Sequence, residues 1–368
     1  MNTPIISAGY KDLIVFKSLK IGPVSLDHNR VKAPYEITLP DNTVHRNELI
    51  YSYDEKVFDT GSSESINLGC MITAQVAINY GLFCEEIQFD GLFDDSDKRF
   101  INDMTGNTSR EIYVNKFLFK NEFLLPPYNS LTPEKRASYT NAGISFINTA
   151  FQNYSLDWQH SDNEQDNYAI LSSGGKDSLL SYGVLKELGK EVHPIFINES
   201  GRHWFTAINA HRHLKETDAN TAKVWCNSDR IFNWVLRLLP FIRNDFDKIK
   251  SDIYPIRLWT MAVFLFGVLP LSRKRKAGRI IIGDEYDSTR RFNHQGITHY
   301  DAIYDQSKYF DNTMTRYFLK KGWNINQFSI IRCLSELLIL KILAKRYPDL
   351  QKHQVSCHAS LEKDGRIY

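Results

Sequence analysis

From residue 168 onward, the sequence alternates between short apolar runs and longer segments with helix-like spacing. The apolar runs that are typical of strands occupy residues 168–172, 192–197, 223–226 and 279–283. The segments with helical spacing occupy residues 177–188, 203–214, 232–241, 254–271, 310–321 and 328–347. Alternating strands and helices predict an α/β fold in which a parallel sheet carries helices on both faces. Ligands of such sheets bind outside the carboxyl ends of the strands, near the point where the strand order reverses.

The residues before this region have a mixed α and β pattern. Expected strands lie at 10–18, 35–39 and 86–89, and expected helices lie at 66–83 and, as a pair broken near Gly106-Asn107, at 96–119. A polar stretch at 159–167 predicts an interdomain linker or an exposed loop. We therefore expect an α+β domain over 1–158, in which substrate recognition is the suggested role, and a second domain over 168–368.

The composition is that of a globular protein, with 42% hydrophobic and 24% charged residues. The net charge of +2 gives no strong signal for nucleic acid or for a membrane surface. The longest apolar stretch, 258–271, contains Thr260, Gly267 and Pro270, so we expect a buried core helix rather than a membrane span. Residues 1–10 lack a signal-peptide pattern, and the five cysteines are dispersed, which favours a cytoplasmic location.

The segment Ser172-Ser173-Gly174-Gly175-Lys176-Asp177-Ser178 stands between an expected strand and an expected helix. Its glycines let backbone N–H groups approach phosphate oxygens, and the start of the helix favours negative charge. Lys176 offers a cation, and the serines offer hydroxyl donors. Asp177 would repel phosphate directly, so we expect it to hold a Mg²⁺ ion that bridges phosphates. A glycine turn before a capped helix is the simpler alternative, but the full set of residues favours a nucleotide site. The Walker A spacing is absent.

A second cluster, Gly283-Asp284-Glu285, directly follows the expected strand at 279–283. Its carboxylates stand at the same edge of the predicted sheet as the first loop. Asp284 and Glu285 could bind ribose, Mg²⁺ or a substrate amine. The alternative is a solvated acidic turn.

Basic and amide side chains follow this turn. They are Arg290, Arg291, His294, His299, Gln306 and Lys308. Such groups near a phosphate site suit an anionic substrate. Lys308 is expected to stabilise charge that develops on the α-phosphate. For any single one of these residues, an ordinary place on a surface loop is an equal alternative.

The segment at 173–178 resembles the pyrophosphate loop of the N-type ATP pyrophosphatases, whose signature is Ser-Gly-Gly-x-Asp-Ser. The resemblance implies a Rossmannoid, adenine-nucleotide hydrolase-like parallel sheet, here with an additional N-terminal α+β domain, and it implies ATP and Mg²⁺ as cofactors. Members of this superfamily transfer AMP to a substrate oxygen and release pyrophosphate. The expected nucleotide-binding residues are Ser172, Ser173, Gly174, Gly175, Lys176, Asp177, Ser178, Gly283 and Asp284, with Phe196 and Ile197 beside the adenine. The expected catalytic residues are Lys176, Asp177, Glu285 and Lys308, and Asp177 is the expected metal ligand.

Within the superfamily, the order of motifs resembles the ATP-dependent epimerases that act on the terminal glutamate of UDP-N-acetylmuramoyl-L-alanyl-L-glutamate. An N-terminal region precedes the loop, and the turn at 283–285, the stretch at 306–308, Leu334-Ser335-Glu336-Leu337 and Ser356-Cys357 follow it. The resemblance spans most of the chain and is tight only in these motifs. The turn at 283–286 lacks an Asn found in the epimerases. Their zinc site needs further cysteines after the Ser-Cys pair; none follows Cys357, so a zinc ion is doubtful.

The expected reaction begins with attack of a small-molecule carboxylate on the α-phosphorus of ATP. The acyl-adenylate can then be epimerised, which needs a general base, and Glu285, His294 and Glu336 are the candidates. One alternative is a ligase similar to 7-cyano-7-deazaguanine synthase, including synthase-like proteins of anti-phage systems. Another is a binding module that senses ATP without turnover. A homodimer is a further expectation.

Overall fold

The computed structural model describes residues 8–149, 158, 167–201, 203–249 and 254–355, together with two short strands near the C-terminus. The strands are β1 (Phe16–Ile21), β2 (Ser25–Asp27), β3 (Arg30–Thr38), β4 (Val44–Tyr53), β5 (Cys84–Asp90), β6 (Gly143–Ile147), β7 (Asn167–Ser172), β8 (Glu191–Asn198), β9 (Ala222–Cys226), β10 (Arg279–Ile282), β11 (Phe292–His294), β12 (Ile297–His299), β13 (Asn326–Phe328), β14 (Glu362–Lys363) and β15 (Arg366–Ile367). The α-helices are α1 (Ser63–Ala74), α2 (Asp95–Ile112), α3 (Lys176–Glu187), α4 (His203–Thr217), α5 (Ser228–Leu236), α6 (Met261–Lys274), α7 (Lys308–Lys320), α8 (Glu336–Arg346) and α9 (Pro348–Gln351).

One half of the central sheet is parallel, in the order β13-β10-β7-β8-β9. Within this half, β7 comes first in the sequence. β8 and β9 follow on one side of it, and β10 and β13 follow on the other side. The strand order therefore reverses between β7 and β10, whose carboxyl ends are in register at Leu171 and Ile282. The expectation of an α/β fold with a large, mostly parallel sheet is confirmed.

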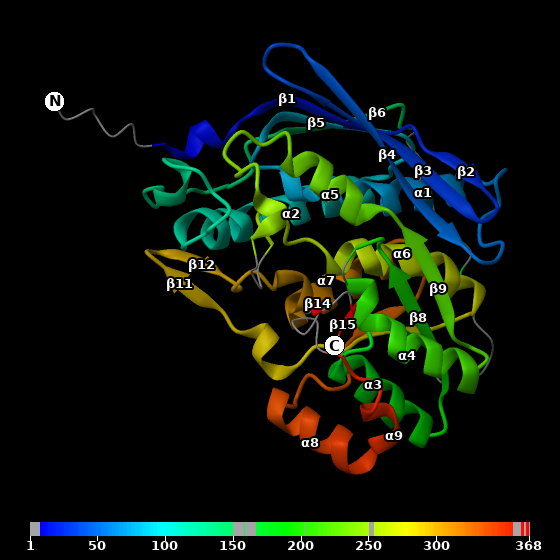
Figure 1. Ribbon diagram of the computed structural model, residues 1–368. Helices are drawn as coiled ribbons and strands as arrows, with labels where there is room; N and C mark the ends of the chain where they lie inside the picture. The colour runs from blue at the N-terminus through cyan, green and yellow to red at the C-terminus, as the bar shows by residue number, and fades with distance from the viewer. Residues whose placement is uncertain are drawn as a thin grey trace.

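The N-terminal strands continue the same sheet. β4 pairs antiparallel with β9, with Tyr51 opposite Cys226 and Tyr53 opposite Val224. Beyond β4 the order is β3-β1-β5-β6, and β2 pairs with β3. In Figure 1 the blue strands β2, β3 and β4 lie above the green β8 and β9. The division into domains at 158 and 168 stays a prediction, and residues 159–166 of the expected linker lie outside the described residues.

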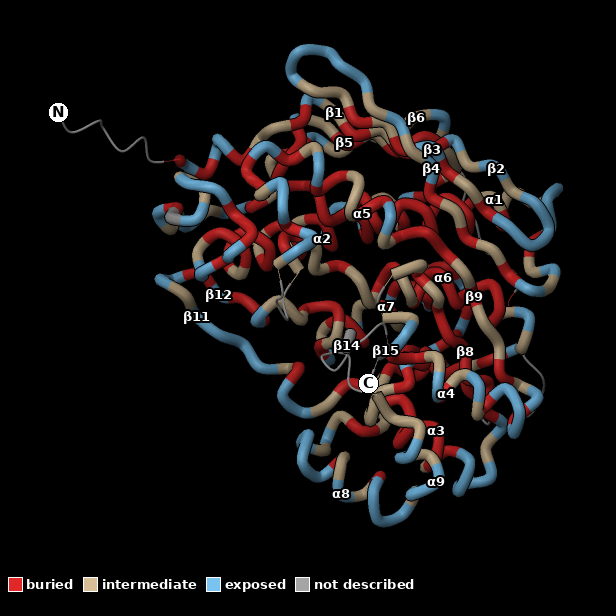
Figure 2. The backbone as a smooth tube through the Cα atoms, in the orientation of Figure 1, coloured by how far each residue is buried: buried red, intermediate tan, exposed pale blue. Residues whose placement is uncertain are grey.

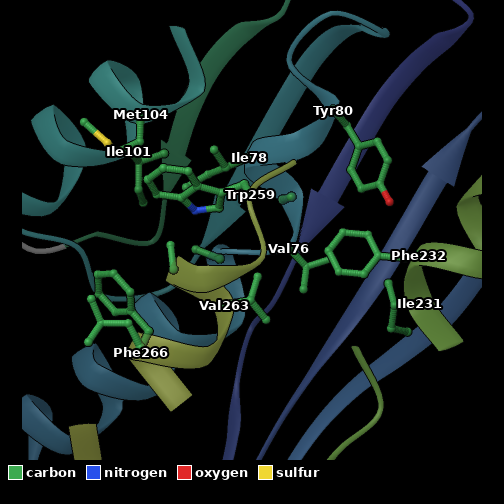
Figure 3. Packing of buried hydrophobic residues seen from close by; sticks show 14 of the residues in the cluster. Val76, Ile78, Tyr80, Ile101, Met104, Ile231, Phe232, Trp259, Val263 and Phe266 are labelled. Carbon is green, nitrogen blue, oxygen red and sulfur yellow. The ribbon is translucent and has the colours of Figure 1, made fainter. Parts of the chain in front are cut away.

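The hydrophobic core also includes residues from both halves of the chain. Trp259, which is 1% exposed, lies beside Ile78 and Ile101 (Figure 3). Its indole N–H donates to Gln75 Oε1 at 3.1 Å. Asn79 Oδ1 accepts the backbone N–H groups of Leu258 (2.9 Å) and Trp259 (2.8 Å). Figure 2 shows the buried residues concentrated in the strands and the central helices.

Helix α6 is mostly buried, as expected for the apolar stretch at 258–271, but it begins at Met261 rather than at residue 254. The preceding residues, 254–260, are not helical, and side chains of the N-terminal half bind the backbone of this segment. Lys116 Nζ donates to the carbonyl of Tyr254 at 2.6 Å, and Asn121 Nδ2 donates to that of Pro255 at 3.0 Å. No helix among the described residues has the length and apolar character needed to cross a membrane.

The expected break near Gly106-Asn107 was wrong, because α2 continues through both residues to Ile112. Asn107 Nδ2 donates back to the carbonyl of Asp103 at 3.0 Å, so its amide group is satisfied within the helix. A π-helical segment, Tyr113–Leu118, follows directly. Packing of the buried face of α2 therefore outweighs the weak helix propensity of Gly106.

Gly106→Ala is expected to raise the free energy of unfolding by about 0.5–1 kcal/mol, because alanine loses less conformational freedom in a helix. The added methyl group would meet only Thr140 Oγ1, at 3.8 Å. Urea denaturation measures the change. Gly81→Ala is the contrasting variant, since its methyl group would lie 2.4 Å from Thr105 Cγ2 and should destabilise the fold. A loss of stability in Gly106→Ala would contradict the prediction.

Several boundaries differ from the expectations. The segment at 10–18 contains a 3-10 helix, Tyr10–Leu13, before β1. The single helix expected at 328–347 is instead the end of β13, a turn and α8. The long strand β4 and the hairpin of β11 and β12 were not predicted. In β4 no residue before Leu49 is buried, so the period-two alternation is confined to Leu49–Tyr53 and the signal is weak.

Candidate nucleotide-binding site

The loop between β7 and α3 passes close to α4, and glycine is required at one position. Gly174 has φ of +74°, and a Cβ there would lie 3.1 Å from Ala207 Cα and from Ala210 Cβ. Gly175 is the N-cap of α3 and has no side chain to cover the first N–H groups of the helix. Ser178 Oγ donates to the Gly175 carbonyl at 3.1 Å. The loop therefore leaves backbone N–H groups at a helix N-terminus without a side-chain cap, which is a geometry suited to an anion.

The end of β10 lies against the first turn of α3. A Cβ at Gly283 would lie 2.7 Å from the Asp177 carbonyl carbon and 2.8 Å from its Cβ. Any larger residue at 283 would push the two segments apart. The two motifs that the sequence placed at one edge of the sheet are therefore in direct contact, at the reversal of strand order.

Lys176 and three carboxylates form the centre of the site. Lys176 Nζ lies 2.9 Å from Asp177 Oδ2, 3.3 Å from Glu285 Oε2 and 3.7 Å from Glu336 Oε1. Burial alone would lower the pKa of Lys176, but the hydrogen bond and charge of Asp177, aided by Glu285, raise it. Burial raises the pKa of Asp177 and of Glu285 against the opposing effect of Lys176. The cluster has one cation among three acidic groups.

Asp177 has one carboxylate oxygen to spare. Its Oδ1 is buried and accepts no hydrogen bond from the described residues. An unpaired acceptor beside an anion loop fits Mg²⁺, which proteins commonly hold through one or two carboxylates together with substrate phosphates. Among the described residues there is no group of three or more His, Cys, Asp or Glu side chains that could hold a metal ion. Cys357, the cysteine for which a zinc site was considered and called doubtful, lies outside the described residues.

Asp284 is held in a buried network that sequence reasoning did not find. Its Oδ2 lies 3.3 Å from Arg332 Nη2, and its backbone N–H and carbonyl bind Ser329 Oγ at 3.1 and 2.7 Å. Arg332 also contacts Asp311 Oδ2 at 2.6 Å. Burial raises the pKa of Asp284 well above its ordinary value, against the lowering effect of Arg332. Arg332 follows β13, which was not predicted as a strand. The sequence therefore did not place Arg332 at the carboxyl edge of the sheet.

The other expected site residues lie elsewhere. Phe196 pairs with Ser172 at the start of the loop, but Phe196 and Ile197 are 0% and 7% exposed, so their side chains offer no open surface to an adenine. Lys308 is exposed at the start of α7, and its Nζ lies 5.7 Å from the Tyr309 ring centroid. His294 packs on Phe119, with ring centroids 4.6 Å apart, on the β11–β12 hairpin. Of the three base candidates, Glu285 and Glu336 share the contact with Lys176, and His294 does not.

Glu199, at the carboxyl end of β8, is a further buried acid that the sequence did not single out. It is 3% exposed, and its Oε1 accepts no hydrogen bond from the described residues. Burial raises its pKa to about 6. The neighbouring Asp229 pairs with Arg257 at 2.5 Å. Glu199 directly follows β8, which was an expected strand, so an acidic residue at a strand end was the signal that could have identified it.

Glu199→Gln is expected to increase stability at pH 8 and to change it little at pH 4.5. The folded protein binds the Glu199 proton more tightly than the unfolded chain, so the carboxyl group costs stability as the pH rises through about 6. The shift in pKa corresponds to about 2 kcal/mol. Urea denaturation at the two pH values measures it. Glu216→Gln, at an exposed position of α4, is the control. An equal change of stability at both pH values would contradict the prediction.

The comparisons with known proteins do not assign this chain to a family. No protein-family model matches the sequence. A search of curated proteins gave no significant match.

Proposed function

We propose that this protein is an ATP pyrophosphatase that activates a substrate carboxylate by transferring AMP to it. The observation that carries the proposal is the contact between the loop at 173–178 and Gly283, at the reversal of strand order. This is where parallel α/β sheets bind their ligands. The order β13-β10-β7-β8-β9 also supports the Rossmannoid, adenine-nucleotide hydrolase-like assignment.

The residues of the loop are arranged to hold the β- and γ-phosphates. The N-terminus of α3, capped by Gly175, offers backbone N–H groups, and Ser173 is exposed beside it. Lys176 Nζ is held beside the loop among acidic oxygens at 2.9–3.7 Å, so it places a cation close to the expected phosphates. These donors are fixed before the reaction, which is how charge in a transition state is best stabilised.

The surplus of carboxylates around Lys176 argues that polyphosphate does not bind alone. Free ATP would be repelled by Asp177, Glu285 and Glu336. Bound Mg²⁺ would neutralise phosphate charge next to Asp177, whose Oδ1 is the best-placed ligand. The site then orients the nucleotide and excludes water from its buried side.

In the proposed reaction, a carboxylate oxygen of the substrate attacks the α-phosphorus. A new phosphorus–oxygen bond forms, the bond from the α-phosphorus to the oxygen bridging the α- and β-phosphates breaks, and pyrophosphate leaves with that electron pair. The loop retains the pyrophosphate. The resemblance to the glutamate epimerases extends the proposal to removal of a proton from the carbon next to the activated carboxyl group. Glu285 is the best-placed base, because burial raises its pKa and it faces Lys176 at 3.3 Å.

The test uses ATP labelled at the α- or the γ-phosphate, with Mg²⁺ and a panel of carboxylates. The expected products are labelled AMP from the first and labelled pyrophosphate from the second. ADP and inorganic phosphate would overturn the proposal, and tight ATP binding without turnover would point to a sensor. Gly174→Ala should lose turnover, because the methyl group meets backbone of α4 at 3.1 Å and φ is +74°. Gly106→Ala, in α2, is the matched control.

A further inference from the structure

A polar cavity lies along the edge of the sheet between β13 and α7. Its volume is about 560 Å³. The residues that line it are Arg279, Lys308, Asp311, Asn312, Thr315, Asn326, Gln327, Phe328, Ser329 and Arg332. Only Phe328 among them is a large apolar residue, so the cavity does not suit a hydrophobic ligand.

The charges of the lining favour an anion. Three cations, Arg279, Lys308 and Arg332, line the cavity, and Asp311 is the one carboxylate among its lining residues. Asp284, outside the lining, also pairs with Arg332. The Asp311 carboxylate is already satisfied by Arg332 at 2.6 Å and by Gln327 Nε2 at 2.8 Å. The Lys308 ammonium has no carboxylate partner within 4.0 Å among residues 8–149, 167–201, 203–249 and 254–355.

The cavity shares a wall with the nucleotide site. Arg332 and Ser329 line it, and both also bind Asp284. Asp284 directly follows Gly283, which lies against Asp177 of the loop. On the surface side, the Lys308 backbone N–H donates to Thr289 Oγ1 at 3.3 Å, close to the turn that contains Glu285. The cavity and the loop at 173–178 are therefore linked through Asp284, which contacts residues of the cavity wall and is adjacent in sequence to Gly283.

We propose that this cavity is a subsite for the acceptor substrate and binds a second anionic group of that substrate, a carboxylate or a phosphate. The proposal rests on the proposed adenylation, in which a different carboxylate of the same molecule reacts. It implies that the substrate is polar and has at least two anionic groups. Lys308 provides the direct contact, and the amides of Asn312 and Asn326 offer hydrogen bonds to neighbouring polar groups.

The test measures binding of citrate and of glycerol 3-phosphate by titration calorimetry at constant ionic strength. Saturable binding of at least one of them to the wild type is expected, and the preferred probe identifies the anionic group. Lys308→Glu and Asn312→Asp should each weaken this binding about tenfold or more, because each places a negative charge at the cavity. Lys320→Glu, at an exposed position of the same helix, should leave it unchanged.

The subsite would be overturned if neither probe bound, or if Lys308→Glu and Asn312→Asp both bound the probe as tightly as the wild type. Binding of Mg·ATP to the wild type is measured separately and tests the proposed function. If the anions bind as expected but Mg·ATP does not, the adenylation fails while the cavity remains an anion site. If Mg·ATP binds and the anions do not, the cavity is not an anion site, while the proposed adenylation is not contradicted.

Discussion

Replacing Asp177 with Asn is expected to lower the rate of AMP formation about 100- to 1000-fold, within the range for loss of one strong electrostatic contact in a transition state. Asp177 has the unpaired buried oxygen of the site and holds Lys176 at 2.9 Å. The amide has nearly the same shape but no charge, so it removes the metal ligand while the loop keeps its form. Turnover of labelled ATP across a Mg²⁺ titration measures the effect, and the variant should need more Mg²⁺ for any remaining activity.

Asp349→Asn is the matched control for this change. Asp349 is exposed on α9 and pairs only with Lys352, at 2.6 Å, among the contacts recorded for the described residues. The control should keep wild-type turnover and the same Mg²⁺ midpoint. If Asp177→Asn did so too, Asp177 would not be the metal ligand. A thermal melt of both variants shows whether lost activity reflects lost folding.

Lys321→Met is expected to lower the free energy of unfolding by about 3–5 kcal/mol, the range for removing one partner of a buried ion pair. Lys321 is 0% exposed on its side chain and lies at the end of α7. It binds Asp94, Asp97 at 3.2 Å and Asn67 Oδ1 at 3.0 Å. Methionine fills a similar volume, so most of the loss would come from removing the buried cation that contacts Asp94 and Asp97.

Lys320→Met provides the comparison, because the adjacent lysine is exposed and its replacement should cost less than about 0.5 kcal/mol. Urea denaturation of both variants gives the difference. Burial raises the pKa of Asp97, and Lys321 opposes that effect. Asp97 should therefore take up a proton at a higher pH in Lys321→Met than in the wild type, and the difference in stability between the two variants should become smaller toward pH 4. Equal stability of the two variants at pH 7 would show that the cluster contributes little to stability.

The parallel half of the sheet was predictable because its strands are short apolar runs between helical segments. β7, β8, β9 and β10 each lie within two residues of their expected bounds. β13 was missed because its three residues, Asn326–Phe328, include two polar side chains and precede an apolar helix. The N-terminal strands were harder, since their pairing with each other and with β9 depends on contacts distant in sequence.

The centre of the candidate site was also foreseen, because Lys176, Asp177 and Glu285 belong to compact motifs at strand ends. Glu336 was foreseen only as a candidate base, and its contact with Lys176 depends on how α8 packs on α3. Arg332 had no local signal at all. Its role comes from the buried carboxylates of Asp284 and Asp311, which meet only in the folded chain.

The antiparallel pairing of β4 with β9 has a consequence for how this molecule can be divided. A fragment that began near residue 168 would keep the nucleotide loop but leave the β9 backbone at Val224 and Cys226 open to solvent. Such an uncovered edge invites association with other chains. It would also expose the apolar residues of α6 that pack on the N-terminal half. Truncation is therefore a poor route to an isolated fragment that carries the loop at 173–178, because the fragment would lack the partner strand of β9.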